Sequence, residues 1–145
     1  MEKISKDSKI EFCLGDIQDY SALVKAMSNV DYVIHSASMK RVDSCEDNPI
    51  ECLNINVLGT DKVLRASIKC GVKKVICISS DRAVSKKSTM GISKSLMEKV
   101  VQYYSKEYGT KHFTKMSVVR FSNLYLSAGS VIPKFLNIIE KGETV

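Results

Sequence analysis

The sequence predicts an α/β protein built on a doubly wound parallel sheet. Short segments that are continuously apolar, as parallel strands are, alternate along the chain with longer segments of helical periodicity. The chain has 145 residues, which is typical of one domain, and 44% of them are hydrophobic. We therefore expect one α/β domain over residues 1–145 and no separate second domain.

The first predicted elements are a strand, a helix and a second strand. Residues 10–14 have strand character and are followed by Gly-Asp, which favours a turn. Residues 20–28 have the periodicity of a short helix, and Asp19 is a residue type that caps helix N-termini. Residues 32–35 are typical of a buried strand.

A long helix is predicted to begin at Pro49 and to end before Gly71. Proline is tolerated in the first turn of a helix, and glycine favours the turn that follows its last residue. Apolar residues recur on one predicted face of this helix at Val57, Leu64 and Ile68.

The second half of the chain repeats the same alternation. Residues 74–79 and 116–121 are predicted strands, residues 88–108 a long helix and residues 130–141 a short closing helix. On the long helix, one predicted apolar stripe consists of Leu96, Val100 and Tyr103. Gly109 follows its last predicted residue.

The charge and composition exclude several classes of protein. With 22 basic and 16 acidic residues the formal net charge is +6, but no long basic run occurs. This distribution does not favour nucleic-acid binding, and it fits a solvated surface or attraction to an anionic small ligand equally well. No apolar stretch approaches the ~18 residues that span a membrane, and the first residues lack the apolar core of a signal peptide. We expect a cytoplasmic protein.

The cysteines and histidines do not predict a metal site. The chain has five cysteines without a Cys-x-x-Cys pair, and two histidines. A disulfide framework or a zinc site would show paired spacings. We expect reduced cysteines that pack as small apolar residues.

Several segments together resemble a known enzyme family through their order and spacing. They are residues 15–19 (Gly-Asp-Ile-Gln-Asp), 35–40 (His-Ser-Ala-Ser-Met-Lys), 56–60 (Asn-Val-Leu-Gly-Thr), 79–83 (Ser-Ser-Asp-Arg-Ala), 90–94 (Met-Gly-Ile-Ser-Lys), 119–123 (Val-Arg-Phe-Ser-Asn) and 129–133 (Gly-Ser-Val-Ile-Pro). This pattern resembles the extended short-chain dehydrogenases of the polysaccharide-biosynthesis group. The likeness is greatest to the inverting, 5-epimerising UDP-N-acetylglucosamine 4,6-dehydratases of capsule and O-antigen synthesis.

The resemblance implies a reaction, a cofactor and partners. In that family, hydride transfer to bound NAD or NADP oxidises the sugar at C4, water then leaves from C6, and the hydride returns to C6. The implied substrate is a UDP-sugar. The resemblance to a Rossmann-type enzyme also leads us to expect a homo-oligomer, or association through an exposed strand edge.

The cofactor-binding residues that the resemblance implies come from five segments. They are Asp16, Ile17, His35, Ser36, Ala37, Asn56, Ser79 and Lys94. By resemblance, Asp16 bonds the adenine, residues 35–37 pass beside the cofactor, Asn56 orders the active-site lysine and Lys94 holds the nicotinamide ribose. Without the resemblance, Asp16 is equally a turn cap, His35 a satisfied core histidine and Asn56 a helix residue with a local hydrogen bond.

The implied catalytic residues are Asp81, Arg82, Met90 and Lys94. By resemblance, Asp81 protonates the departing hydroxyl group, which requires a raised pKa. Arg82 stands where the family has a lysine base, and a guanidinium that stays protonated is a poor base, although it can orient a substrate oxygen. Met90 stands where most short-chain dehydrogenases have tyrosine. The inverting branch that this chain resembles also has methionine at this position. The alternative for Met90 and Lys94 is a core methionine and an exposed lysine.

The implied substrate-binding residues are Lys40 and Asn123, and a solvated loop lysine is the alternative for Lys40. The sequence contains no Gly-x-Gly-x-x-Gly, the motif that holds a dinucleotide pyrophosphate. By resemblance the chain is truncated at both ends and begins at the third strand. We therefore expect an incomplete Rossmann sheet that lacks its first two strands, with three parallel strands, helices on both faces and a misplaced or re-paired segment 10–14. A non-catalytic chain without cofactor binding is the alternative function.

Overall fold

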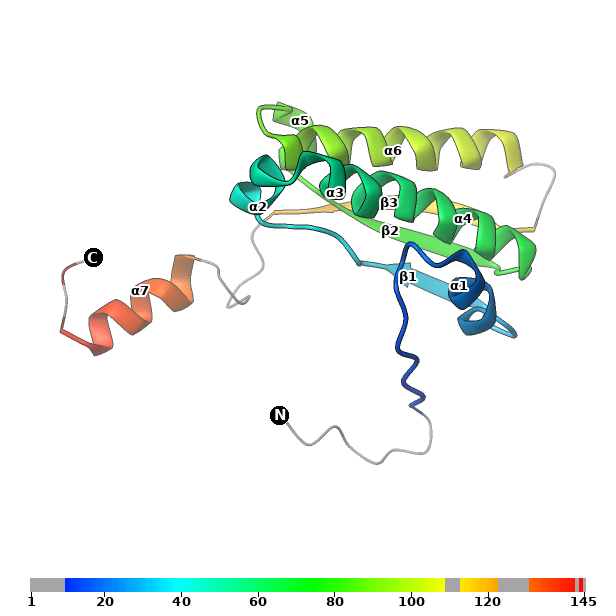
Figure 1. Ribbon diagram of the computed structural model, residues 1–145, viewed down its shortest axis with the longest axis horizontal. Coiled ribbons are helices and arrows are strands. Elements are labelled where there is room, and N and C mark those ends of the chain that lie inside the picture. Colours follow the sequence, from blue (N-terminus) through cyan, green and yellow to red (C-terminus); the bar gives the residue numbers. More distant parts are fainter. Residues whose placement is uncertain (1–9, 109–112, 123–130, 143, 145) are drawn as a thin grey trace.

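The protein contains a three-stranded parallel sheet with helices packed on one face (Figure 1). The computed structural model describes residues 10–108, 113–122, 131–142 and 144. The strands lie in the order β1 (Tyr32–His35), β2 (Lys74–Ser80) and β3 (Lys115–Phe121). The α/β fold class and these three predicted strands are confirmed.

Helices form both crossovers of the sheet. Between β1 and β2 the chain forms α2 (Val42–Asp47), α3 (Pro49–Leu53), the π-helical turn η1 (Asn54–Gly59) and α4 (Thr60–Lys69). Between β2 and β3 it forms α5 (Arg82–Ser85) and α6 (Thr89–Tyr108). Figure 1 shows α3, α4 and α6 together on one side of the sheet.

The expectation of helices on both faces is wrong for the described residues. Parallel crossovers are right-handed, and both crossovers here step in the same direction along the sheet, so their helices cover the same face. The other face carries exposed apolar side chains, among them Ile34, Ile76 and Val119. The strand order of the described segment therefore decides which face is covered.

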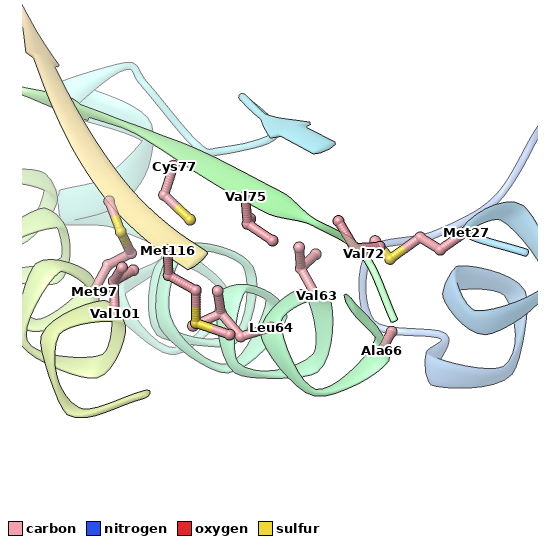
Figure 2. Packing of buried hydrophobic residues seen from close by; sticks show 10 residues of the cluster. All are labelled: Met27, Val63, Leu64, Ala66, Val72, Val75, Cys77, Met97, Val101 and Met116. Atoms are coloured by element: carbon pink, nitrogen blue, oxygen red, sulfur yellow. The ribbon is translucent and has the colours of Figure 1, made fainter. Parts of the chain in front are cut away.

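The main core lies between the sheet and helices α4 and α6 (Figure 2). Its buried residues are Met27, Val63, Leu64, Ala66, Val72, Val75, Cys77, Met97, Val101 and Met116. Of the apolar stripe predicted on α6, Val100 packs against this core, but the prediction is wrong for Leu96, which is 45% exposed, and for Tyr103, which is 59% exposed. The buried face of α6 instead includes the charged residues Lys94 and Glu98, which a search for apolar periodicity does not find.

The segment before β1 combines a confirmed and an unconfirmed expectation. Helix α1 (Tyr20–Ala26) begins after Asp19, whose carboxylate accepts hydrogen bonds from the amides of Ser21 at 2.9 Å and Ala22 at 3.0 Å, as predicted. Residues 10–14, in contrast, do not form a strand. A strand needs a hydrogen-bonded neighbour, and none of the three described strands pairs with this segment. The outer edge of β1 is therefore an open edge of the described sheet.

The helix predicted from Pro49 to Gly71 is three helical elements rather than one. Pro49 opens α3 and the positive φ of Gly71 (+68°) follows α4, as predicted, but η1 interrupts the α-helical hydrogen bonding between them. A π-helical turn inserts one residue and is frequent at functional sites. Helix α2 was not predicted. Helix α7 (Val131–Glu140) confirms the predicted closing helix.

Candidate active site

A pocket of about 350 Å³ lies beside the carboxyl end of β1. It is lined from segment 13–17, α1, β1 and the loop after β1. Five of the residues predicted to bind a cofactor share this lining, namely Asp16, Ile17, His35, Ser36 and Ala37. Ligands of open α/β sheets bind at the carboxyl ends of the strands, so the pocket has the expected location.

Asp16 and Ile17 take up local contacts in the turn before α1. The Asp16 carboxylate accepts a hydrogen bond from the Gln18 amide at 2.7 Å, which is the turn-capping arrangement weighed above. A Cβ built on Gly59 of η1 would lie 3.2 Å from Ile17. The glycine therefore lets Ile17 approach the helix backbone, and this contact holds one wall of the pocket against η1.

His35 is a buried histidine with a hydrogen-bond partner. Its Nε2 lies 2.8 Å from the hydroxyl of Thr60, which itself donates to the backbone oxygen of Asn56 at 2.8 Å. Since the hydroxyl proton goes to Asn56, the Nε2–H of His35 donates to Thr60. Burial, with a smaller contribution from the charge of Lys94, lowers the pKa of His35 to about 4. The ring is therefore neutral at pH 7.

Lys94 is buried, so the alternative of an exposed lysine is wrong for this residue. It is 7% exposed, and its ammonium group donates a hydrogen bond to the backbone oxygen of Ile78 at 3.0 Å. Burial lowers the pKa of Lys94. Within the described part of the chain this is the one hydrogen bond of an ammonium group that has three donors, and a buried donor favours a partner.

Asn56 connects the loop after β1 to α6. Its side-chain oxygen accepts from the Met39 amide at 2.8 Å, and its amide nitrogen donates to the Met39 carbonyl at 3.1 Å and to the hydroxyl of Ser93 at 2.9 Å. These partners are far away in sequence, so a purely local role for Asn56 is wrong. Ser93 precedes Lys94, and Asn56 thereby ties the lysine's helix to the loop that follows the pocket.

Met90 and Gly91 pack the N-terminal turn of α6. Met90 is 4% exposed and contacts the buried pair Cys45 and Cys52, so its side chain is a core methionine in this structure. A Cβ on Gly91 would lie 2.7 Å from the backbone oxygen of Arg82. Only glycine permits this approach between α5 and α6.

Asp81 lies at the surface immediately after β2. Its carboxylate accepts hydrogen bonds from the hydroxyls of Ser80 and Ser122, both at 2.9 Å. These two donors lower the pKa of Asp81. The expected raised pKa is therefore wrong for this structure, because the carboxyl group is neither buried nor close to another carboxylate. Arg82 follows as the first residue of α5 and is exposed.

Ser79 contacts the charged interior of α6. Its hydroxyl donates to the Glu98 carboxylate at 2.6 Å, and Glu98 also accepts from Arg120 at 2.6 and 2.8 Å. Neither Glu98 nor Arg120 was predicted as a site residue. The available signal was a glutamate four residues after Lys94, on the same face of a helix that otherwise buries apolar residues.

The two residues predicted to bind the substrate, Lys40 and Asn123, are not part of the contacts described above. Lys40 is exposed in the loop between β1 and α2, and Asn123 lies outside the described residues.

Of the cysteines, Cys45, Cys52 and Cys77 are buried, Cys70 is half-buried and Cys13 is exposed. Among the residues that the structure describes, no cluster of ligands could hold a metal ion, and no helix is long and apolar enough to cross a membrane.

Curated relatives match most of this chain. UDP-glucose 4-epimerase of Rickettsia canadensis is 43% identical over 135 residues, which cover 93% of this chain and 39% of the relative. The same enzyme of Rickettsia typhi is 43% identical over 136 residues, which cover 94% of this chain and 40% of the relative. The chain thus spans about two fifths of the length of these relatives.

Solved structures share the fold. Pen from Bacillus thuringiensis is 39% identical with a TM-score of 0.89, covering 94% of this chain and 43% of that one. UDP-glucose 4-epimerase from Thermotoga maritima with UDP-glucose is 25% identical with a TM-score of 0.79, covering 90% and 49%. At 24% identity and a TM-score of 0.83, dTDP-glucose 4,6-dehydratase from Streptomyces venezuelae with NAD bound shows the fold alone, covering 98% and 48%.

A family model described as polysaccharide biosynthesis protein matches residues 1–145. This match agrees with the relatives and with the Rossmann-type sheet. The chain belongs to the polysaccharide biosynthesis protein family, is homologous to proteins named UDP-glucose 4-epimerase, and shares its Rossmann-type fold with a dTDP-glucose 4,6-dehydratase.

Proposed function

We propose that this chain supplies the nicotinamide-facing part of an NAD- or NADP-dependent 4,6-dehydratase that acts on UDP-N-acetylglucosamine in capsule or O-antigen synthesis. The observation that carries the proposal is the position of Lys94. A buried ammonium group, which makes one hydrogen bond among the residues that the structure describes, lies at the carboxyl end of β2, and its charge acts on His35 in the adjacent pocket. Such a group is typical of a ligand-binding site.

The residues around the pocket fit a nicotinamide cofactor. Ser36 and Ala37 are small and exposed, which leaves room for a flat ligand, and Asp16 offers an exposed carboxylate for the adenine amino group. Lys94 has donors for ribose hydroxyls. When bound, the cofactor supplies the acceptor for a hydride from C4 of the sugar.

Asp81, Arg82 and Lys40 are the proposed residues for the sugar nucleotide. Asp81 is the proton donor for the departing hydroxyl. Because its pKa is lowered in this structure, substrate binding has to raise it. Substrate binding must exclude water or displace a serine hydroxyl so that the carboxyl group holds a proton near neutral pH. Arg82 orients a substrate oxygen or the diphosphate, while Lys40 and Asn123 contact the sugar nucleotide.

The proposal is tested first by ligand binding. Millimolar NADP+ or NAD+ is expected to raise the melting temperature of the purified chain by several degrees in a saturable manner. Lys94→Met keeps the length and apolar stem of the side chain and is expected to abolish the rise. The matched control is Lys99→Met, on the exposed face of the same helix, which keeps it. No shift in the unmodified chain, or an equal shift in Lys94→Met, contradicts the proposal.

A 4-epimerase acting on UDP-glucose is the second candidate, favoured by the name of relatives that are 43% identical. Both reactions need oxidation at C4, but only the dehydratase removes a proton at C5. Incubation with UDP-N-acetylglucosamine or UDP-glucose in D2O separates them by NMR. Deuterium at C5 with loss of the C6 hydroxyl indicates the dehydratase, and inversion at C4 without deuterium indicates the epimerase. Asp81→Asn is expected to abolish the dehydratase product.

A non-catalytic chain remains the third candidate because Arg82 replaces the expected lysine base. It predicts neither product, with or without a cofactor-dependent rise in melting temperature. Recovery of product in Arg82→Lys would show that this one substitution is responsible.

A further inference from the structure

Glu98 is a charged side chain on the buried face of α6, one turn after Lys94. It is 5% exposed, and its carboxylate lies between the helix and the two strands β2 and β3. A carboxylate in such a place is costly unless it is paired and hydrogen-bonded. The proposed function assigns no role to it.

Three donors hold Glu98 in place. The Ser79 hydroxyl donates at 2.6 Å, and the Nε and Nη2 atoms of Arg120 donate to the two carboxylate oxygens at 2.8 and 2.6 Å. The Arg120 pair and the Ser79 bond lower the pKa of Glu98, so that the group is ionised at neutral pH. Such a two-pronged pair fixes geometry as well as charge.

This network meets the Lys94 site at the end of β2. Ser79 directly follows Ile78, whose backbone oxygen accepts the hydrogen bond from the Lys94 ammonium group. Helix α6 is thus joined to β2 twice, once by the hydrogen bond from Lys94 to Ile78 and once by the hydrogen bond from Ser79 to Glu98.

We propose that Glu98, held by Ser79 and Arg120, is a positioning residue that fixes the Lys94 ammonium group against the end of β2. The role of the lysine toward a cofactor rests on the proposed function, but the geometry and its test do not. Glu98 carries the charge opposite to that of the Lys94 ammonium group and acts on it directly, whereas Arg120 holds the Glu98 carboxylate by both oxygens. Replacing Glu98 therefore removes the charge that acts on Lys94, and replacing Arg120 breaks the same ion pair but keeps that charge.

The charged groups around Lys94 decide how its pKa responds to each substitution. Glu98 is the one carboxylate among the titratable groups of the described residues that act on Lys94, which are His35, Cys45, Cys52, Cys77 and Glu98. The histidine is neutral, and burial raises the pKa values of Cys45 and Cys77 to about 12. Near neutral pH, Glu98 is therefore the ionised carboxylate that acts on Lys94.

The test is NMR titration of the Lys94 side chain in the 145-residue chain, labelled at lysine Cε, without ligand. Glu98→Gln is expected to lower the pKa of Lys94 by about half a unit or more, and Arg120→Gln, which keeps the carboxylate charge, to change it by clearly less. The control is Glu107→Gln, an exposed glutamate of the same helix, which is expected to leave it unchanged. A residue that only stabilised the fold would change the pKa of Lys94 equally in both variants, because both break the same ion pair.

A further variant decides the proposal if Glu98→Gln does not fold. Glu98→Asp keeps the charge but withdraws it by one methylene group, and it is expected to lower the pKa of Lys94 by less than Glu98→Gln does. An unchanged or raised pKa of Lys94 in a folded Glu98→Gln or Glu98→Asp chain overturns the proposal. Because no ligand is added, this outcome is independent of whether NADP+ binds, and a failed cofactor titration leaves the positioning role standing.

Discussion

The two sides of the candidate site are built in different ways. Around Lys94, three side chains of α6 and η1 reach partners in other elements, and the charged groups are buried or paired. Around Asp16, the carboxylate accepts a hydrogen bond from a near neighbour, and the turn reaches other elements through Ile17 against Gly59 and through the hydrogen bond from Lys62 to the Gln18 backbone oxygen at 2.7 Å. The preceding residues are open, with Leu14 fully exposed. One side is fixed by buried polar contacts between elements, and the other combines a local turn with an open segment.

This difference shows which part of a parallel-sheet site depends on its own crossovers. The Lys94 side is made by β1, β2 and the helices between and after them, so each element finds its packing partner within the described chain. Segment 10–14 has strand character, but no described strand pairs with it, and its apolar residues stay exposed. Strand propensity without a hydrogen-bonded neighbour does not produce a strand.

The largest expected effect removes the connection on the Lys94 side. Asn56→Ala leaves the half-buried Met39 amide without its acceptor and removes the amide donor to the Met39 carbonyl and to the Ser93 hydroxyl. An unsatisfied buried group costs ~1–3 kcal/mol and each further lost hydrogen bond about 1 kcal/mol, so we expect the free energy of unfolding to fall by ~4 kcal/mol. Urea denaturation measures it.

The matched control for this change is Asn54→Ala in the same π-helical turn. Asn54 is half-buried, and among the described residues its side chain makes no hydrogen bond. The control is expected to cost less than ~1 kcal/mol. An equal loss in both variants would mean that the turn itself, and not the Asn56 contacts, supplies the stability.

Asn56 also shows how much the sequence could predict. The three strands, helix α6 and the capping of α1 follow from periodicity and from single residues such as Asp19. Sequence also identified Asn56 and Lys94, through the resemblance. It did not predict the partners Met39 and Ser93, because they are separated from Asn56 by 17 and 37 positions and depend on tertiary packing.

The charged interior of α6 was missed for a related reason. A search for apolar positions placed Leu96 on the buried stripe, whereas the structure buries Lys94 and Glu98 beside it. Burial of a charge depends on a partner such as Arg120, which lies on another element. The raised pKa expected for Asp81 is wrong because two hydroxyl groups lower the pKa, that of the adjacent Ser80 and that of Ser122, which directly follows β3.

The second prediction concerns the loss of stability at low pH caused by His35, which lines the pocket and is affected by the charge of Lys94. His35 has a pKa of about 4 in the folded chain against 6.5 for the free side chain. The unfolded chain therefore binds a proton that the folded chain does not, and stability is lost as the pH falls from about 6.5 to about 4. The full loss is about 3 kcal/mol. Urea denaturation between pH 7 and pH 4.5 measures most of it, and carboxylates such as Glu98 and Asp81 contribute at the acidic end of this range.

The variant His35→Gln isolates this contribution. Glutamine has an amide donor for the Thr60 hydroxyl and does not titrate, so most of the dependence of stability on pH between 7 and 4.5 is expected to disappear. A slope that persists undiminished in His35→Gln would assign it to another group and place the pKa of His35 near its ordinary value.

The smallest predicted effect compares one glycine from each side. Gly91→Ala on the Lys94 side puts a Cβ 2.7 Å from the backbone oxygen of Arg82, and backbone cannot move aside cheaply. We expect it to destabilise the fold by about 2 kcal/mol as α5 and α6 separate. Gly15→Ala on the Asp16 side meets its nearest atom, the Cβ of Ala22, at 3.6 Å, an ordinary contact.

For Gly15→Ala we expect a change within ~0.5 kcal/mol of the unmodified chain. Thermal unfolding of the two variants side by side therefore measures how unequally the two sides are packed. Equal losses would show that segment 10–17 is held as tightly as the helix contacts at α6. A neutral Gly91→Ala would instead show that α5 moves freely, and that the Asp81 and Arg82 positions, which border α5, are adjustable rather than fixed.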